Sequence, residues 1–379
     1  MLDSLHIKNF RCFEDLTIPS LGRVNLIVGK NNSGKSTLLE AVSVFSALNE
    51  ADDKYSVLNN LLETLSHISK SRGKDEQRDT KIFGNNLNEN NKKFHNGESG
   101  FELTDNDKKI NYKVFIKKEN DNKFKFFINE FDFKINTSTL EIEKPEWMPS
   151  FNANENDIDW DEIFSEVEER LISNDNHDLQ FYGYSCKISP ANLLTENELS
   201  ELWDEIIKRN KRKEVLETIL IINEDIIDLD FVYISLEDDT DADMASIVRI
   251  RNKDKPVSLK YFGEGVRRLL QLILTAFQIR KGGSLLIDEF ENGLHYSIQE
   301  EVWEKLFKLA KELDIQVFAT THSEDTVKAF SKVSLRSPEE GHLISLGRSA
   351  YGENKGKIIA VVHDENDLQY ILDTGMEVR

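Results

Sequence analysis

The first fifty residues alternate apolar and polar positions in a way that predicts strands followed by a helix. Leu5–Phe10 alternates, Arg11–Phe13 continues that strand, and residues 14–22 form a turn that contains a proline. The apolar run Val24–Val28 predicts a buried strand, and apolar residues at helical spacing predict a helix from about Gly34 to Leu48. This part of the chain therefore predicts a strand, a loop and a helix in direct succession.

Beyond residue 50 the pattern becomes irregular and then alternates again. Apolar residues at helical spacing between 57 and 68 predict one helix, and residues 71–100 are rich in Asn, Lys, Asp and Gly, which is typical of a surface loop. Short alternating segments separated by Asp and Asn then predict an antiparallel meander. These segments are Phe101–Leu103, Tyr112–Ile116, Lys123–Ile128 and Phe131–Ile135.

Helical spacing returns between about residues 142 and 215. One amphipathic stripe runs from Trp160 to Leu171, and a second helix begins at Thr195, where Glu198 completes a capping box. This second helix ends in the basic run Lys208–Lys213. The run has two interpretations, namely solvated cations that favour a helix C-terminus, or a surface that docks a phosphate backbone or a partner.

The last third of the chain alternates strands with helices. Such alternation predicts a parallel sheet with helices on both faces. The predicted strands are 231–235, 247–250, 284–287 and 315–319, and the predicted helices are 266–279 and 297–313, with a final helix and strands after them.

The composition describes a polar, acidic chain. Of its 379 residues, 39% are hydrophobic and 31% are charged, and the formal net charge is −21. The sequence contains neither an apolar run long enough to span a bilayer nor a signal-peptide pattern, so we expect no membrane association and a cytoplasmic location. The negative field repels nucleic acid, so a nucleic-acid contact would require a local basic patch or a partner. Cys12 and Cys186 are too few for a disulfide framework and are predicted to be buried thiols.

The segment Gly29–Thr37 carries the most specific motif in the chain. It reads Gly-x-x-x-x-Gly-Lys-Ser-Thr between the predicted strand and the predicted helix, which is the Walker A pattern in its expected context. Its two glycines let backbone N–H groups approach phosphate, Lys35 reaches the β- and γ-phosphates, and the Ser36 hydroxyl is a ligand for Mg²⁺. We predict that a nucleoside triphosphate is bound by Asn31, Asn32, Ser33, Gly34, Lys35, Ser36 and Thr37.

Two later segments supply the remaining chemistry. Asp288 and Glu289 follow an apolar strand, and a nucleotide-binding sheet requires such an acidic residue at the end of a strand next to the P-loop strand, where it holds Mg²⁺. Glu289 is then placed to polarise the attacking water. His322, in Thr320–Ser323, follows the next strand and is a candidate sensor of the γ-phosphate. The glycines in Phe262–Arg268 precede a helix whose N-terminus is able to meet phosphate.

In this order, the motifs resemble those of the ABC-type ATPases that include RecF, the SMC-like repair ATPases and the OLD (overcoming lysogenization defect) family. The resemblance implies an α/β P-loop NTPase fold, an ABC/RecF-like ATPase head with a mixed antiparallel-β and helical insertion. We therefore expect the head at 1–50 and 216–379, a flexible loop with an antiparallel β subdomain at 51–140, and a helical insertion at 141–215. The segments that carry the resemblance are Ile7–Phe13, Gly29–Thr37, Phe262–Arg268, Ile287–His295 and Thr320–Ser323.

The resemblance also implies how the site works. Two subunits would meet head to tail, so that the signature segment of one closes the ATP held by the other. The implied catalytic residues are Glu289 as the base, Lys35 and His322; the implied nucleotide-binding residues outside the P-loop are Arg11, Gly263, Glu264, Gly265 and Arg268; and the implied Mg²⁺ ligands are Ser36 and Asp288.

Two features depart from the family pattern. The signature reads Phe-Gly-Glu-Gly at 262–265 and lacks the hydroxyl of a Leu-Ser-Gly-Gly signature, so the backbone of Gly265 with Arg267 or Arg268 would have to replace it. OLD nucleases carry a C-terminal TOPRIM domain, for which the residues after Ser323 are too few and contain no Asp-x-Asp pair. We therefore expect any effector to be a separate protein, as in the PARIS and abortive-infection systems.

Three functions fit these expectations. The first is an ATPase that acts as the sensor or regulatory subunit of a bacterial anti-phage defence system and controls a separate nuclease or toxin. The second is a RecF/SMC-like DNA-repair ATPase that binds DNA in an ATP-dependent way. The third is an ATP-dependent assembly scaffold with little turnover. In each case we expect ATP, Mg²⁺ and a homodimer or larger homo-oligomer assembled through the ATP sites, with DNA as a further candidate partner.

Overall fold

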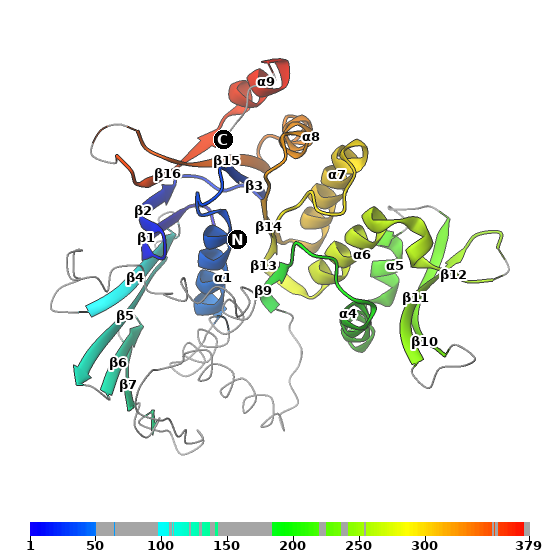
Figure 1. Ribbon diagram of the computed structural model, residues 1–379, viewed down its shortest axis with the longest axis horizontal. Helices are drawn as coiled ribbons and strands as arrows, with labels where there is room; N and C mark the ends of the chain where they lie inside the picture. The colour runs from blue at the N-terminus through cyan, green and yellow to red at the C-terminus, as the bar shows by residue number, and fades with distance from the viewer. Residues whose placement is uncertain are drawn as a thin grey trace.

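A computed structural model shows two β-sheets on either side of one helix, with further helices and a small lobe beyond (Figure 1). The predicted helix between 57 and 68 (apart from Thr64), the stripe at 160–171 and most of the predicted loop lie outside the described residues, and residues 98–100 of that loop begin a strand. The structure describes residues 1–50, 64, 98–105, 108, 110–120, 123–128, 131–136, 141–142, 184–219, 225–235, 242–253, 255–350, 352 and 355–374.

A six-stranded sheet, in the order β16-β15-β3-β14-β13-β9, forms the centre of the molecule. Its strands are parallel except β16, which runs antiparallel to β15 at one edge. The prediction of a parallel sheet is therefore confirmed for the strands at 284–287 and 315–319. It is wrong for the strands at 231–235 and 247–250, which pair antiparallel with each other in a separate three-stranded sheet. The strands are β3 (Val24–Gly29), β9 (Tyr184–Ser189), β13 (Ile279–Ile287), β14 (Gln316–Thr320), β15 (Gly341–Arg348) and β16 (Ile358–His363).

Helices cover both faces of this sheet because its strands carry apolar side chains on both sides. One face, with Ile27, Leu286 and Phe318, packs against α1, and the other, with Leu26 and Leu285, packs against α6, α7 and α8 (Figure 1). The predicted helices on both faces are therefore confirmed. The helices are α1 (Lys35–Glu50), α6 (Glu264–Phe277), α7 (Tyr296–Leu313), α8 (Glu324–Ser334) and α9 (Glu365–Thr374).

A seven-stranded antiparallel sheet, in the order β2-β1-β4-β5-β6-β7-β8, lies on the other side of α1. The predicted meander is confirmed, and β1 joins it to the N-terminal strands by pairing with both β2 and β4. The strands are β1 (Leu5–Phe10), β2 (Phe13–Ile18), β4 (Glu98–Asp105), β5 (Ile110–Asn120), β6 (Lys123–Ile128), β7 (Phe131–Asn136) and β8 (Glu141–Ile142).

The N-terminal strands differ from the sequence prediction at Arg11 and Cys12. These residues do not continue β1 but form the turn between β1 and β2, with Phe10 paired to Phe13. Arg11 adopts a left-handed φ of 51°, which reverses the chain. Segment 14–22 was predicted as a turn, yet its first part belongs to strand β2, where Leu16 and Ile18 share one face of the strand and are buried.

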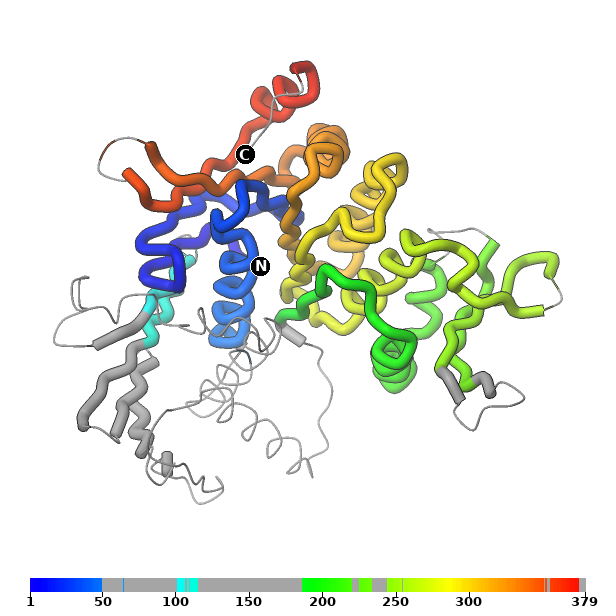
Figure 2. The backbone as a smooth tube through the Cα atoms, viewed as in Figure 1, coloured from blue at the N-terminus to red at the C-terminus, as the bar shows by residue number. Residues whose placement is uncertain are grey.

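A small lobe, formed by α4, α5 and the strands β10, β11 and β12, lies beyond α6 (Figure 2). Trp203 of α4 packs with Leu229 and Val248 in its core. The capping box predicted at Thr195 is confirmed, because the Thr195 side chain accepts from Glu198 N while the Glu198 carboxylate accepts from Thr195 N. The lobe contains α4 (Glu196–Lys208), α5 (Arg212–Ile219), β10 (Ile226–Ser235), β11 (Ala242–Ile250) and β12 (Val257–Ser258), and the short helix η1 (Leu259–Phe262) leads from it to α6.

Strand β9 was not predicted, since residues 142–215 carry mainly helical spacing. It is a short edge strand that pairs only with β13, from Ile279 to Ile287, and its mixed polar composition resembles that of a loop. Among the described residues, no helix combines the length and the hydrophobicity needed to cross a bilayer. The domain boundaries stay a prediction.

Candidate functional site

The carboxyl ends of β3, β14 and β13 meet at one edge of the central sheet and carry the predicted residues. β3 ends at Gly29, β14 ends at Thr320, and Asp288 directly follows β13. The strand order places β14 between the other two. The expectation that the Asp288 strand lies next to the P-loop strand is therefore wrong, and the strand next to it is the one that leads to His322.

The P-loop has the backbone that phosphate binding requires. Gly29 and Gly34 have φ of 152° and 95°, and a Cβ at Gly34 would lie 2.6 Å from the Phe13 ring. Asn32 also has a left-handed φ, of 61°. Where residues with positive φ alternate with residues with negative φ, their backbone N–H groups turn toward one point. This is the geometry of an anion nest.

Lys35 is buried in the loop that it follows. Its Nζ donates to the carbonyl oxygens of Gly29, at 2.8 Å, and Lys30, at 3.2 Å, and the residue is only 6% exposed. The ammonium group is therefore held at the mouth of the loop by the backbone. Asn31 and Asn32 are exposed at the tip, whereas Ser33 and Thr37 are buried.

Ser36 and Asp288 come together from opposite parts of the chain. The Ser36 hydroxyl donates to the Asp288 carboxylate, with 3.4 Å from Oγ to each carboxylate oxygen. Thr320 Oγ1 donates to Asp288 Oδ1 at 2.6 Å and accepts from Glu289 N at 2.9 Å. Thr320 therefore orients the carboxylate of one acidic residue and the backbone of the next, a role that the sequence analysis did not assign to it.

Glu289 is held in an unusual conformation. Its φ is 47°, in the left-handed region that residues other than glycine seldom occupy, at a cost of about 1–3 kcal/mol. Asn292 donates its side-chain N–H to Glu289 Oε2 at 2.8 Å. The backbone and Asn292 thus restrict where the carboxylate points, and such a fixed position is what the predicted role of Glu289 in orienting a water molecule would require.

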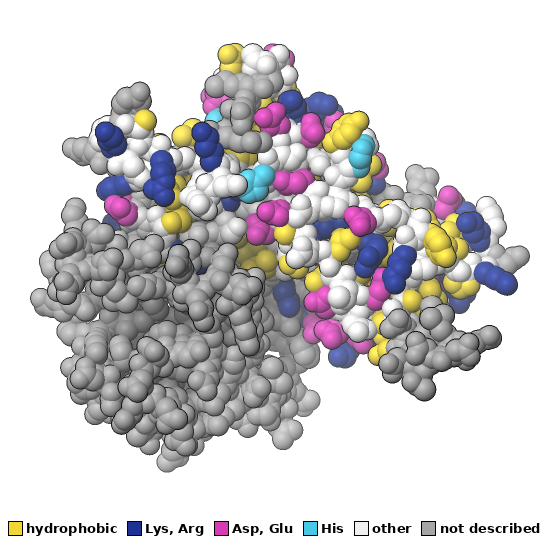
Figure 3. All heavy atoms as spheres, in the orientation of Figure 1, with side chains coloured by type: hydrophobic (Ala, Val, Ile, Leu, Met, Phe, Trp, Pro, Cys, Tyr) yellow, Lys and Arg dark blue, Asp and Glu magenta, His cyan; other side chains and the backbone are white. Residues whose placement is uncertain are grey.

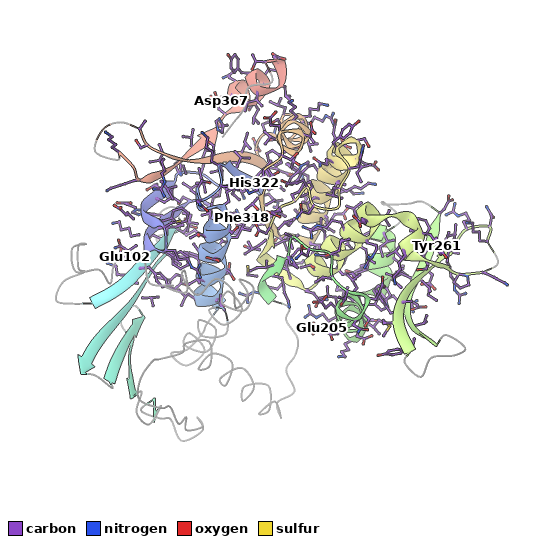
Figure 4. All side chains as sticks on the ribbon, viewed as in Figure 1. Glu102, Glu205, Tyr261, Phe318, His322 and Asp367 are labelled. Carbon is purple, nitrogen blue, oxygen red and sulfur yellow. The ribbon has the colours of Figure 1, made fainter. Side chains whose placement is uncertain are left out.

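Glu291 joins the segment after β13 to the segment after β14. Its Oε2 accepts from the Thr321 hydroxyl at 2.7 Å, and its Oε1 accepts from His322 N at 2.8 Å. His322 lies just beyond the end of β14, with Phe318 of the same strand below it in Figure 4. The position of His322 thus depends on a side chain that the sequence analysis did not single out.

Arg268 occupies the interior. It is fully buried, and its guanidinium donates to the carbonyl oxygens of Pro190 and, at 3.3 Å, Asp288. Burial lowers the pKa of Arg268 to about 10, although the negative charges of Asp288 and Glu291 oppose this shift. The sequence analysis placed Arg268 against the nucleotide of another subunit, whereas in this structure it supports the backbone at Asp288 of its own chain.

The other signature residues lie at the start of α6. Gly263, the N-cap residue, has a φ of 84° and is exposed together with Glu264. A Cβ at Gly265 would lie 3.0 Å from Ile298 and 3.5 Å from the carbonyl oxygen of Gly293, so the helix packs closely on the start of α7. Contact of this helix end with a second subunit stays a prediction.

The turn between β1 and β2 borders the P-loop. Arg11 Nε lies 3.1 Å from Glu40 of α1, and both side chains are 8% exposed. Cys12 is solvent-exposed and Cys186 is half-buried, so the prediction that both are buried is wrong. Although Cys12 is exposed as a whole residue, its sulfur lies against Gly34 and hydrogen bonds to the Thr37 side chain, and the partial burial of the sulfur raises the pKa of the thiol.

The donor set fits a metal that arrives with a nucleotide. Among the described residues, no group of three or more His, Cys, Asp or Glu side chains is arranged to hold a metal ion. The hydroxyl of Ser36 and the carboxylate of Asp288 are nevertheless hard oxygen ligands at one point of the P-loop. Mg²⁺ is commonly held by one or two such protein ligands together with phosphate oxygens and water.

A family model described as "AAA domain, putative AbiEii toxin, Type IV TA system" matches residues 24–327, which include every element of the site except the β1–β2 turn. The chain belongs to this family. It is an AAA-family ATPase domain, and the predicted class of α/β P-loop ATPase fold, with parallel and antiparallel sheets, is confirmed.

Individual relatives of this AAA-family protein differ in how much they share with it. An "ATP/GTP phosphatase" of Helicobacter pylori is 23% identical and covers 93% of this chain and 96% of its own. An "OLD nuclease" of Thermus scotoductus is 50% identical over 44 residues, 12% of this chain and 8% of that protein. Among solved structures, the SMC head domain from Thermotoga maritima covers 96% of this chain and 99% of its own at 14% identity, with a TM-score of 0.45.

Proposed function

We propose that this protein is a Mg²⁺-dependent nucleoside triphosphatase that hydrolyses ATP. The observation that carries this proposal is the network at the sheet edge, where Ser36 of the P-loop meets Asp288 and Thr320 links Asp288 to Glu289. The full-length relative named an ATP/GTP phosphatase supports the same reaction class.

Each side chain has a distinct part in the proposed reaction. The P-loop amides and Lys35 bind the phosphates, and Ser36 and Asp288 would hold Mg²⁺. The chemistry that the ion supplies when bound is neutralisation of charge on the phosphate oxygens. Glu289, oriented by Asn292, accepts a proton from the attacking water, and His322 contacts the γ-phosphate region from the end of β14.

We further propose that a second copy of the chain completes the site. The exposed N-terminus of α6, at Gly263 and Glu264, offers backbone N–H groups and a positive dipole end to a phosphate held by another subunit. ATP would then assemble the protein, and hydrolysis would release it. Such a switch suits a regulator of a separate effector, and the toxin named in the family description and the relative named an OLD nuclease favour a role in defence.

Substitution Glu289→Gln tests the reaction and the assembly together. The amide keeps the shape of the side chain but cannot accept the proton, so turnover should fall by about 10²–10⁴-fold while ATP stays bound. Phosphate release would report turnover, and light scattering with and without ATP would report assembly. The matched control is Glu304→Gln, on the surface of α7. Retained turnover in the Glu289 variant would remove the base assignment, and a monomer with ATP bound would remove the shared site.

A further inference from the structure

Five exposed cations follow one another between β11 and α6. Arg249 belongs to β11, Lys260 belongs to η1, and Arg251, Lys253 and Lys255 lie in the connection through β12. No carboxylate of the described residues lies within ion-pair distance of any of them. We name these five residues the basic surface, and Figure 3 shows Lys and Arg side chains on this lobe.

The run Lys208–Lys213, which the sequence singled out, is different. Four of its five cations meet carboxylates of the chain itself, and Arg209 also donates to the carbonyl oxygen of Gln278 at 2.9 Å. Its charge is therefore largely neutralised, which favours the interpretation as a solvated helix end. The pairs are Arg209–Glu205 at 3.2 Å, Lys211–Glu214 at 2.6 Å, Arg212–Asp228 at 2.8 Å and Lys213–Glu217 at 3.8 Å.

In a chain of net charge −21, a succession of exposed cations without carboxylate partners forms a local positive surface that can attract an anionic ligand. An exposed aromatic side chain accompanies them: Tyr261, next to Lys260 on the same lobe (Figure 4), is 84% exposed. Proteins bind single-stranded nucleic acid with cations that lie along its phosphate backbone and with aromatic side chains on which its bases stack. A membrane surface would instead require an apolar face, and Tyr261 is the only large apolar side chain exposed among the described residues from 249 to 262.

We propose that the basic surface binds the phosphodiester backbone of single-stranded nucleic acid, with Tyr261 stacking on a base. The elements involved are connected to the candidate nucleotide site through α6. η1 leads directly into α6, whose Arg267 lies 3.4 Å from Glu196, and the other carboxylate oxygen of Glu196 accepts from Ser246 N of β11 at 2.8 Å. The next residue of α6, Arg268, donates to the carbonyl oxygen of Asp288. Single-stranded nucleic acid bound at β11 and η1 therefore regulates ATP turnover through α6. This consequence rests on the proposed function.

Binding is tested with the full chain and fluorescently labelled oligonucleotides in the absence of ATP. The probes are single-stranded DNA, single-stranded RNA, the matching DNA duplex and a poly-glutamate peptide. The test variant combines Lys253→Glu, Lys255→Glu and Lys260→Glu, and the matched control combines Lys208→Glu, Lys211→Glu and Lys213→Glu, with the same change in net charge. We expect single-strand affinity to fall at least about tenfold in the test variant and to stay within about twofold in the control.

Two further readouts distinguish the parts of the surface. The slope of log affinity against log salt should become shallower by about 2 in the test variant, since each phosphate contact on a single strand contributes about 0.7. Tyr261→Ala should weaken single-strand binding and leave duplex binding unchanged. Thermal melting checks that the variants are folded, and Lys253→Glu alone replaces the triple variant if that one is not.

The proposal is overturned if the wild-type chain binds none of the oligonucleotides, if both triple variants lose affinity equally, or if poly-glutamate binds as tightly with the same residue dependence. The last result would assign the surface to an acidic protein. Because no ATP is present, failure of the proposed ATPase reaction leaves this result intact. Stimulation of phosphate release by the same oligonucleotide is measured separately and tests the coupling.

Discussion

Glu291 and His322 are joined across two segments of the chain, since Glu291 Oε1 accepts the backbone N–H of His322 at 2.8 Å. The other carboxylate oxygen accepts from Thr321, so the carboxylate spans the turn that follows β14. His322 is a candidate contact of the γ-phosphate, whereas Glu291 lies in the segment that packs beside the start of α6. Glu291 is therefore a positioning residue for His322.

Glu291→Ala should lower kcat with little change in ATP affinity, because the P-loop is untouched. Loss of a hydrogen bond to a charged group corresponds to about 1.5–3 kcal/mol, or about 10- to 100-fold. The double variant that also carries His322→Ala should lose no more kcat than the less active of the two single variants. The reason is that both substitutions act through His322. Steady-state kinetics measure this cycle, with Glu300→Ala on α7 as control, and additive losses would assign Glu291 an independent role.

Lys35→Ala should weaken ATP binding by about 10- to 100-fold, the effect of removing one charged hydrogen-bonding group. Lys35 is buried at the loop, while Lys30 is exposed at its edge and provides the matched control as Lys30→Ala. Isothermal titration with ATP and Mg²⁺ compares the two variants. Equal affinities would show that the phosphates are not bound where Lys35 lies.

Arg268→Ala should lower the free energy of unfolding by about 2–5 kcal/mol, because it leaves a cavity and two buried carbonyl oxygens without a donor. Those oxygens belong to Pro190 and Asp288. Glu264→Ala is the control on the same helix, since Glu264 is exposed at its start. Denaturant titration measures both. An Arg268 variant as stable as wild type, but unable to assemble with ATP, would instead place Arg268 at the subunit contact.

The Cys12 thiol should react slowly with iodoacetamide at neutral pH, because burial against the P-loop raises its pKa and only the thiolate is reactive. A raised pKa keeps the thiol protonated, so the reaction rate should increase only at a pH above the range of an ordinary cysteine. ATP should slow the reaction further by covering Thr37 and Gly34. Peptide mass spectrometry follows the modification, and reaction of Cys12 at the rate of a free thiol would contradict this placement.

Features with a local signal were predictable. The strand, loop and helix around Gly29–Thr37, the capping box at Thr195 and the meander from residue 101 each depend on neighbouring residues whose spacing shows in the sequence. The turn at Arg11 was missed because its signal is a backbone conformation rather than a residue type. Strand β9 was missed because its pairing partner, β13, begins 90 residues later and supplies the apolar surroundings.

The supporting residues of the site were hidden for a similar reason. Thr320 and Glu291 each act on groups 30 to 32 positions away in the chain, so no short motif contains both partners. Arg268 did carry a signal: helical spacing places it on one face with Leu272 and Thr275, which are buried. The helical spacing therefore indicates an interior position for Arg268. The resemblance to signature segments led instead to the expectation that Arg268 contacts the nucleotide of another subunit.

Strand β3 has its neighbours on both sides from the far end of the chain, β14 at Gln316–Thr320 and β15 at Gly341–Arg348. During synthesis the Walker A segment leaves the ribosome long before either neighbour exists, and contacts of such long sequence separation form late. A nascent chain halted before β14 would contain every phosphate-binding residue of the loop and still lack the sheet that shapes it. The ability to bind a nucleotide would therefore be acquired only after β14 and β15 have been synthesised, and shorter nascent chains would be kept out of the proposed ATP-dependent assembly.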